Sequence, residues 1–275
     1  MDDKAVTAVL LLSCPDQKGL VASVSDFLYR NDGNIIHADQ HTDSEEGLFL
    51  QRVEWELAGF HVPREEIAEA FRPIAERFGM TWSLHFSDHV PRIAVFVSQQ
   101  AHCMYDLLAR QRMGEFRAEL PLVISNHPDL RSVAASFGAH YHHFPITPDT
   151  KADQEKAIIE TLEMQRIDLI VLARYPTRII NIHHSFLPAF AGARPYHQAY
   201  ERGVKVIGAT AHYVTAKLDQ GPIIDQDVVR ASHRDSVADL VRKGKDLEKV
   251  VLARAVDLHL RNRVVVYGNK TVVFD

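Results

Sequence analysis

Apolar runs of strand length alternate with amphipathic stretches through the middle of this 275-residue chain. Between residues 92 and 173, every apolar run but the last is followed by a stretch whose apolar residues recur at helical spacing. Strands are predicted at 92–98, 120–125, 140–145 and 168–173, and helices at 102–113, 129–137 and 151–165. This alternation is typical of an α/β protein and predicts a doubly wound, mostly parallel sheet.

The same domain is expected to continue to the end of the chain, over 92–275. Its later elements are predicted strands at 179–182, 205–213 and 222–229, helices at 196–202 and 236–260, and a terminal hairpin at 264–274. The hairpin is expected to turn at a Gly-Asn pair, a sequence that tight β-turns favour. No additional domain is predicted after the long helix.

The first 86 residues carry a different pattern of elements. Strands are predicted at 5–13, 35–41, 48–57 and 80–86, and helices at 20–28 and 63–78. The resulting order, β-α-β-β-α-β, is the ferredoxin-like arrangement. The chain is therefore expected to contain a small domain at 1–86, a linker at 87–91 and the larger α/β domain.

Polar residues crowd the end of the apolar run at 179–182. Asn181 and His183 lie two positions apart, so on a strand both point to one side while Ile182 points to the other. Ligands of open α/β sheets bind at the carboxyl ends of the strands. An amide and an imidazole facing one spot suit a developing oxyanion and a proton transfer. Asp219, in a loop before another apolar run, adds a carboxylate.

The sequences around these residues resemble a known family. They read Asn-Ile-His-His-Ser-Phe-Leu-Pro-Ala-Phe at 181–190, Gly-Ala-Arg-Pro-Tyr-His at 192–197 and Leu-Asp-Gln-Gly-Pro-Ile-Ile at 218–224. Such motifs are similar to those of the formyltransferase-fold enzymes of folate metabolism, and the fuller match resembles the formyltetrahydrofolate deformylase family. The resemblance extends over essentially the whole chain, and the first 86 residues resemble an ACT domain, a small-molecule sensor.

The resemblance implies a reaction and a set of site residues. Water would attack the formyl carbon of 10-formyltetrahydrofolate, releasing formate and tetrahydrofolate, which would balance folate pools and supply formate for purine biosynthesis. Asn181 would stabilise the oxyanion, His183 would carry a proton, and Asp219 would orient and deprotonate the water. No cofactor and no metal are required. The expected substrate-binding residues are Leu172, Arg174, His184, Ser185, Gly192 and His212.

The ACT resemblance implies an effector site between paired domains, and hence a homo-oligomer. The residues expected to line it lie in the loop 16–19 and the turn 31–34, namely Asp16, Gly19, Asn31 and Asn34. Both segments also suit helix ends, and the two roles are compatible. Glycine and methionine are the first candidate effectors. His37 and His41 share a strand face, but no further ligand accompanies them, so a metal is not expected there.

Charge and cysteine content exclude several classes of protein. The chain has 31 basic and 36 acidic residues, a net charge of −5, so it lacks the broad basic field of a nucleic-acid-binding protein. Two distant cysteines predict no disulfide framework and favour a reducing compartment. No apolar run approaches the roughly 20 residues of a membrane helix. With no signal-peptide pattern at the start, a cytoplasmic protein without membrane partners is expected.

Two rival functions can be weighed from the sequence. A formyltransferase acting on glycinamide ribonucleotide would share Asn181, His183 and Asp219, but it would need a cradle for the phosphate. The loop 98–103 follows the first strand of the α/β domain and contains no glycine, which favours water as acceptor. A non-catalytic amino-acid or folate sensor would have no need of the three intact polar residues.

One junction is unusually short. Only residues 174–178 separate the predicted strand 168–173 from the apolar run at 179–182. Parallel neighbours need a crossover of about a dozen residues. Three explanations stay open: a deletion, a local antiparallel turn, or a mobile segment missing from the sequence. The third is favoured, because lids over ligand pockets are drawn from segments of low stability.

Overall fold

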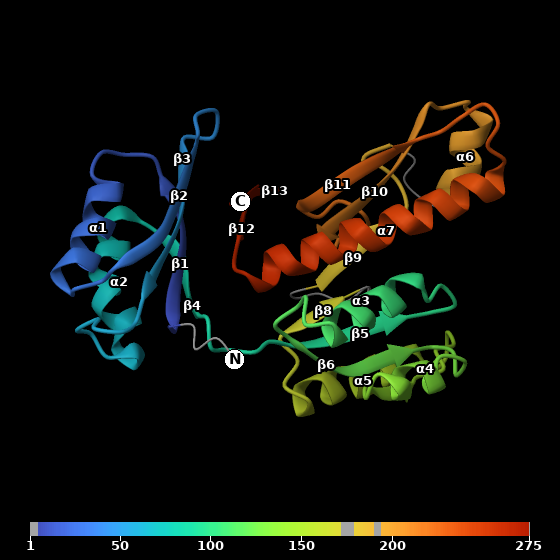
Figure 1. The fold of residues 1–275 in the computed structure, drawn as a ribbon, viewed down its shortest axis with the longest axis horizontal. Coiled ribbons are helices and arrows are strands. Elements are labelled where there is room, and N and C mark those ends of the chain that lie inside the picture. Colours follow the sequence, from blue (N-terminus) through green and yellow to red (C-terminus); the bar gives the residue numbers. More distant parts are fainter. Residues whose placement is uncertain (1–4, 172–178, 190–193, 275) are drawn as a thin grey trace. The chain divides into compact units, whose positions relative to one another are not determined.

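A computed structural model describes residues 5–171, 179–189 and 194–274 of the chain (Figure 1). The chain divides into two compact units. One comprises Met1–His89 together with Arg261–Asp275, and the other comprises Val90–Leu260.

The first unit has the predicted ferredoxin-like order. Its elements are β1 (Thr7–Pro15), α1 (Leu20–Arg30), β2 (Ile35–Asp43), β3 (Leu48–Glu56), a 3-10 turn at Arg64–Glu66, α2 (Ile67–Phe78) and β4 (Thr81–Phe86). The strands form an antiparallel sheet in the order β2-β3-β1-β4. Leu10, Leu12 and Trp55 face α1 and α2 and form a buried core with residues of both helices. Because side chains alternate along a strand, Leu10 and Leu12 share the face of β1 that the helices cover.

The terminal hairpin belongs to the first unit. It consists of β12 (Val264–Tyr267) and β13 (Lys270–Val273). Val265 and Phe274 pack against Val9, Leu11 and Leu50, which point away from the face covered by the helices. The predicted range of the second domain, 92–275, is therefore too long, because its last residues complete the core of the first unit.

The second unit is the predicted α/β sheet. Its strands are β5 (Arg92–Val97), β6 (Glu119–Ser125), β7 (His140–His143), β8 (Leu169–Val171), β9 (Ile179–His183), β10 (Val206–Tyr213) and β11 (Ile223–Arg230). Its helices are α3 (His102–Arg112), α4 (Arg131–Ser136), α5 (Lys151–Met164), α6 (Pro195–Glu201) and α7 (Val237–Leu260). The strand order is β11-β10-β9-β8-β5-β6-β7, parallel from β9 to β7, with β10 and β11 antiparallel.

Strand β5 is buried on both faces. Ala94 and Phe96 form a cluster with Ile158 of α5. Ile93 and Val95 point to the other face, where Figure 1 shows α3 and α7. From β5 the sheet extends one way through β6 and β7 and the other way through β8 and β9. Such a switch in strand order opens a crevice at the carboxyl ends of β5 and β8, where ligands of doubly wound sheets bind.

The structure excludes one of the explanations for the short junction before residue 179. Val171 of β8 pairs with Ile180 of β9 in a parallel register. A local antiparallel turn is therefore the wrong explanation. The connecting residues 172–178 lie outside the described residues. Among the helices that the structure describes, none has the length and apolar character of a bilayer-spanning segment.

Candidate active site

Asn181 and His183 lie on the carboxyl half of β9, facing the same side as predicted. Strand β10 runs antiparallel to β9 and places His212 directly opposite Asn181. The Asn181 Nδ2 atom lies 3.4 Å from His212 Nε2, and His212 Nδ1 lies 2.9 Å from the carbonyl oxygen of Tyr213. A carbonyl oxygen only accepts, so Nδ1 carries the proton and Nε2 accepts from the amide. His212 thereby fixes which end of the Asn181 amide is the donor.

Asp219 reaches this pair from the loop after β10. Its Oδ2 atom lies 3.4 Å from His183 Nδ1, and its Oδ1 atom lies 4.0 Å from His212 Nε2. The carboxylate is largely buried, with 13% of the side chain exposed. The backbone of Asp219 is left-handed, with φ of 54°. Non-glycine residues adopt this conformation at a cost and are concentrated at functional sites.

Gly221 explains how the loop returns so close to β10. A Cβ atom at this position would lie 1.7 Å from the carbonyl oxygen of Tyr213. The backbone N–H of Tyr213 donates to the Pro222 carbonyl at 2.9 Å. Because only glycine lacks a Cβ, the close approach that brings Asp219 back to His183 requires glycine here.

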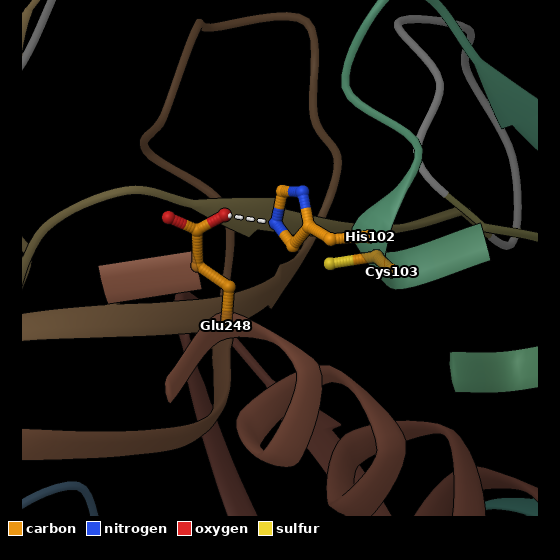
Figure 2. Close-up of side chains that lie close together, drawn as sticks. All are labelled: His102, Cys103 and Glu248. Atoms are coloured by element: carbon orange, nitrogen blue, oxygen red, sulfur yellow. Dashed lines mark hydrogen bonds and ion pairs between the residues drawn. The ribbon is translucent and has the colours of Figure 1, made fainter. Parts of the chain in front are cut away.

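His184 makes a different contact from its neighbour His183. Its Nδ1 atom lies 2.9 Å from Oε2 of Glu248 on α7. The same oxygen accepts from His102 Nε2 at 2.7 Å, and Oε1 accepts from the hydroxyl of Tyr196. Glu248 is 1% exposed. We call His102, Cys103, His184, Tyr196 and Glu248 the Glu248 cluster; Figure 2 shows His102, Cys103 and Glu248, from α3 and α7.

The hydrogen bonds keep Glu248 ionised despite its burial. Burial alone raises the pKa of Glu248, but the hydrogen bonds from His102 and His184 outweigh it and lower the pKa to about 2. The hydrogen bond to Glu248 in turn raises the pKa of His184. Gly244, one helical turn before Glu248, leaves room for Tyr196, whose ring would lie 2.1 Å from a Cβ there.

The sequence interpretation missed Glu248, His102 and Tyr196. A usable signal was the buried stripe of α7, at 244, 248, 251, 252 and 255, in which a glutamate interrupts small and apolar residues. A charged residue within such a stripe predicts a buried partner. The donor atoms of His102, Cys103 and Glu248 lie within 4.8 Å of one another, a spacing that could hold a metal ion. The Glu248 carboxylate, however, already accepts three hydrogen bonds.

Ser185 contacts backbone instead of forming a Ser–His pair. Its hydroxyl donates to the Ala189 carbonyl at 2.6 Å, and its own carbonyl accepts from the Thr210 hydroxyl at 2.8 Å. These bonds shape the loop after β9. Three of the predicted substrate-binding residues lie outside the described residues: Leu172, Arg174 and Gly192.

The predicted effector residues lie at the two ends of α1. Gly19 precedes the helix with φ of 93°, and the Asp16 N–H donates to the Gly47 carbonyl at 2.8 Å. At the other end, Asn31 Nδ2 donates to Phe27 O and Asn34 Nδ2 donates to Glu56 Oε2, each at 2.7 Å. The helix between them is about 15 Å long at 1.5 Å per residue. A small ligand contacting both segments therefore needs a second copy of the domain.

Comparisons with known proteins agree along the whole chain. A family model described as formyl transferase matches residues 91–256, and an ACT domain model matches residues 8–76. The formyltetrahydrofolate deformylase of Synechocystis is 59% identical over 280 residues, covering 98% of this chain and 99% of that protein. The Bacillus subtilis deformylase is 47% identical, covering 97% and 93%.

Solved structures give the same result. A formyltetrahydrofolate deformylase from Pseudomonas syringae superposes with a TM-score of 0.95 at 45% identity, covering 100% of this chain and 96% of that chain. A glycinamide ribonucleotide transformylase from Symbiobacterium toebii gives a TM-score of 0.64 at 33% identity and covers 70% of this chain and 98% of that chain. This chain therefore belongs to the formyltetrahydrofolate deformylase family.

Proposed function

We propose that this chain hydrolyses 10-formyltetrahydrofolate to formate and tetrahydrofolate. The observation that carries the proposal is the convergence of Asn181, His183 and Asp219 at the carboxyl end of β9, in a chain similar to deformylases along its whole length. An amide donor, an imidazole and a carboxylate supply the groups that hydrolysis of a formyl–nitrogen bond needs.

In this mechanism Asp219 accepts a proton from water while the water oxygen attacks the formyl carbon. Asn181, oriented by His212, donates an N–H to the oxyanion that develops. His183, whose Nδ1 faces Asp219, passes a proton to the folate nitrogen as the carbon–nitrogen bond breaks. Formate and tetrahydrofolate then leave. The 3.4 Å separation of His183 and Asp219 is typical of catalytic pairs that tighten only in the substrate complex.

The transferase alternative has less support. The glycinamide ribonucleotide transformylase from Symbiobacterium toebii covers 70% of this chain, whereas the deformylases also cover the first unit. The loop between Val97 of β5 and His102 of α3 contains no glycine to hold a phosphate with its backbone. The sensor alternative leaves the joint placement of Asn181, His183 and Asp219 without a purpose.

The regulatory part of the proposal concerns the first unit. A small amino acid, with glycine and methionine as first candidates, would bind where the loop 16–19 of one copy meets the turn 31–34 of another. The positions of these segments at opposite ends of α1 support a homo-oligomer. A cytoplasmic enzyme that supplies formate for purine biosynthesis fits this regulation. An effector changes activity only if it binds two states with different affinity.

The deciding experiment incubates the full chain with 10-formyltetrahydrofolate, with and without glycinamide ribonucleotide, and follows formate and tetrahydrofolate. We expect formate in both reactions. A formylated nucleotide formed without formate would identify a transferase, and the absence of any turnover would favour a sensor. Repeating the assay with glycine and with methionine tests the effector assignment.

A further inference from the structure

We infer that Tyr213 and His259, which we call the positioning pair, hold the oxyanion donor of this enzyme in its working orientation. The hydroxyl of Tyr213 lies 2.8 Å from His259 Nδ1, and the two rings meet edge to face with their centroids 5.7 Å apart. The inference rests on the proposed hydrolysis of 10-formyltetrahydrofolate, and it concerns how the Asn181 amide is aimed at the formyl oxygen.

Strand β10 presents its last two side chains to different partners. His212 lies opposite Asn181 of β9, and the next residue, Tyr213, points to the other side of the sheet. There it meets His259, in the last turn of α7, the helix that packs along β9, β10 and β11 (Figure 1). The Tyr213 side chain is therefore turned away from the side where Asn181 and His212 meet.

The backbone of Tyr213 connects the two sides. Its carbonyl oxygen accepts from His212 Nδ1 at 2.9 Å, so His212 Nε2 is left to accept from Asn181 Nδ2 at 3.4 Å. The second N–H of the Asn181 amide is then available to the oxyanion. If the Tyr213 carbonyl turned away, the His212 proton could move to Nε2, because the partner of one ring nitrogen decides where the proton sits. The Asn181 amide could then flip and present its oxygen to the oxyanion.

The side-chain bond supplies an anchor where the sheet is irregular. The pairing of β10 with β11 shifts register immediately before His212, which locally disrupts the ladder. The peptide group that follows Tyr213 is held at one end, where the Val214 N–H donates to the Ile179 carbonyl at 2.9 Å. The bond to His259 fixes the Tyr213 side of that group to a 24-residue helix. Burial raises the pKa of Tyr213, so the hydroxyl stays protonated and the bond persists.

The first test is spectroscopic and needs no turnover. In the full-length protein with isotopically labelled histidine nitrogens, the NMR shifts report which ring nitrogen carries the proton, and His212→Gln identifies the signals of His212. We expect one tautomer in the wild type, with the proton on Nδ1, and a mixture of tautomers in Tyr213→Phe. The same tautomer in both proteins would overturn the inference.

The second test is a double-mutant cycle on formate release. Losing an oxyanion donor costs about 10²–10³-fold in kcat, so misaiming one should cost less: we expect Tyr213→Phe to lower kcat about tenfold, with KM within about twofold of the wild type. In an Asn181→Ala background the same substitution should cost nothing more, because the donor that it positions is gone. An equal loss in both backgrounds would mean that Tyr213 acts on the fold alone, and the inference would be wrong.

His259 offers a conservative and a non-conservative variant. His259→Asn keeps a polar atom close to the place of Nδ1, whereas His259→Leu removes it. We expect His259→Leu to match Tyr213→Phe in kcat and in the His212 tautomer, and His259→Asn to recover most of the loss. Equal kcat values for the two His259 variants would contradict the positioning pair. These variants also decide the question if Tyr213→Phe does not fold.

Tyr267→Phe is the matched control. It removes a tyrosine hydroxyl that bonds to Asp43 Oδ2 at 3.0 Å in the first unit. We expect kcat and the His212 tautomer to stay those of the wild type. A loss as large as that of Tyr213→Phe would show that the effect is not specific to the positioning pair and would overturn the inference. Wild-type enzyme that releases no formate refutes the proposed hydrolysis, whereas the histidine spectra still test the positioning pair.

Discussion

Two adjacent histidines, His183 and His184, contact carboxylates in different settings: one lies in a loop and the other is buried on a long helix. His183 lies 3.4 Å from Asp219, a loop residue whose backbone is left-handed. His184 lies 2.9 Å from Glu248, which is held on a long helix and hydrogen-bonded by two further side chains. A single peptide bond thus separates the longer His183–Asp219 contact from the shorter His184–Glu248 contact.

The difference indicates what each pair is built to do. A proton-transfer pair must be able to change its protonation and its geometry, and a long contact in the absence of substrate is compatible with that. A buried carboxylate with three donors stays ionised and holds its neighbours in place. We therefore expect damage to Asp219 to appear in turnover, and damage to Glu248 to appear in stability.

The largest expected effect is that of Asp219→Asn on turnover. Loss of the general base should lower kcat by about 10²–10⁴-fold, while folate binding and the melting temperature stay close to those of the wild type. Steady-state kinetics and a folate titration check this. Near-normal formate release would show that Asp219 is not the general base. The contrast between the His183–Asp219 and His184–Glu248 pairs would then have no functional meaning.

Glu248→Ala should act on folding. Removing the carboxylate leaves the buried Tyr196 and the largely buried His102 without their acceptor. The half-exposed His184 loses its partner as well. Breaking such a buried network costs about 3–5 kcal/mol. Denaturant unfolding measures the loss. The exposed neighbour Asp246→Asn should stay within about 0.5 kcal/mol of the wild type. Equal stabilities of the two variants would mean that the tight pair is not structural.

Gly221→Ala tests the route by which Asp219 returns to β10. The added methyl group meets the Tyr213 carbonyl oxygen, so the loop must shift, at a cost of about 1–3 kcal/mol. Turnover should fall as well, because Tyr213 follows His212. Gly114→Ala is a useful control: it has φ of 78° but no atom within 4 Å of the new Cβ, so it reports backbone strain alone. A change in stability without a change in turnover would separate the loop from the mechanism.

The smallest expected effect is a pH dependence of the stability difference between wild type and Glu248→Gln. The pKa of Glu248 is lowered from an ordinary 4.5 to about 2, so its contribution is complete above pH 4.5 and is lost as the pH falls towards 2. By pH 4 the loss should be about 1 kcal/mol. The raised pKa of His184 has the opposite effect on stability. The stabilisation from its charged form is complete below pH 6.5 and is lost as the pH rises through the pKa of His184 in the folded protein. Unfolding series from pH 3 to 8 should show the widest difference between 4.5 and 6.5, and a difference independent of pH would contradict the electrostatic account.

Local patterns made much of this molecule predictable. Strand and helix periods gave both folds, and the two-residue spacing of Asn181 and His183 placed them on one side of β9. The Glu248 cluster could not be predicted in the same way, because Glu248 meets His102 across 146 residues. The terminal hairpin could be predicted because the pairing of its two strands is local. Its packing on β1 and β3 could not be predicted, because it depends on surfaces formed by residues more than 200 positions earlier in the chain.

The position of the terminal hairpin affects both the synthesis of the protein and its response to proteolysis. Val265 and Phe274 complete a core that Val9, Leu11 and Leu50 begin, so the first unit encloses the second along the chain. During synthesis, the ribosome completes the whole second unit before it adds the residues that cover this face of the first sheet. Until those residues are made, the apolar face of the sheet stays exposed. Two backbone connections, after His89 and after Leu260, then join the units. A protease that cuts only one of them should leave both units held together.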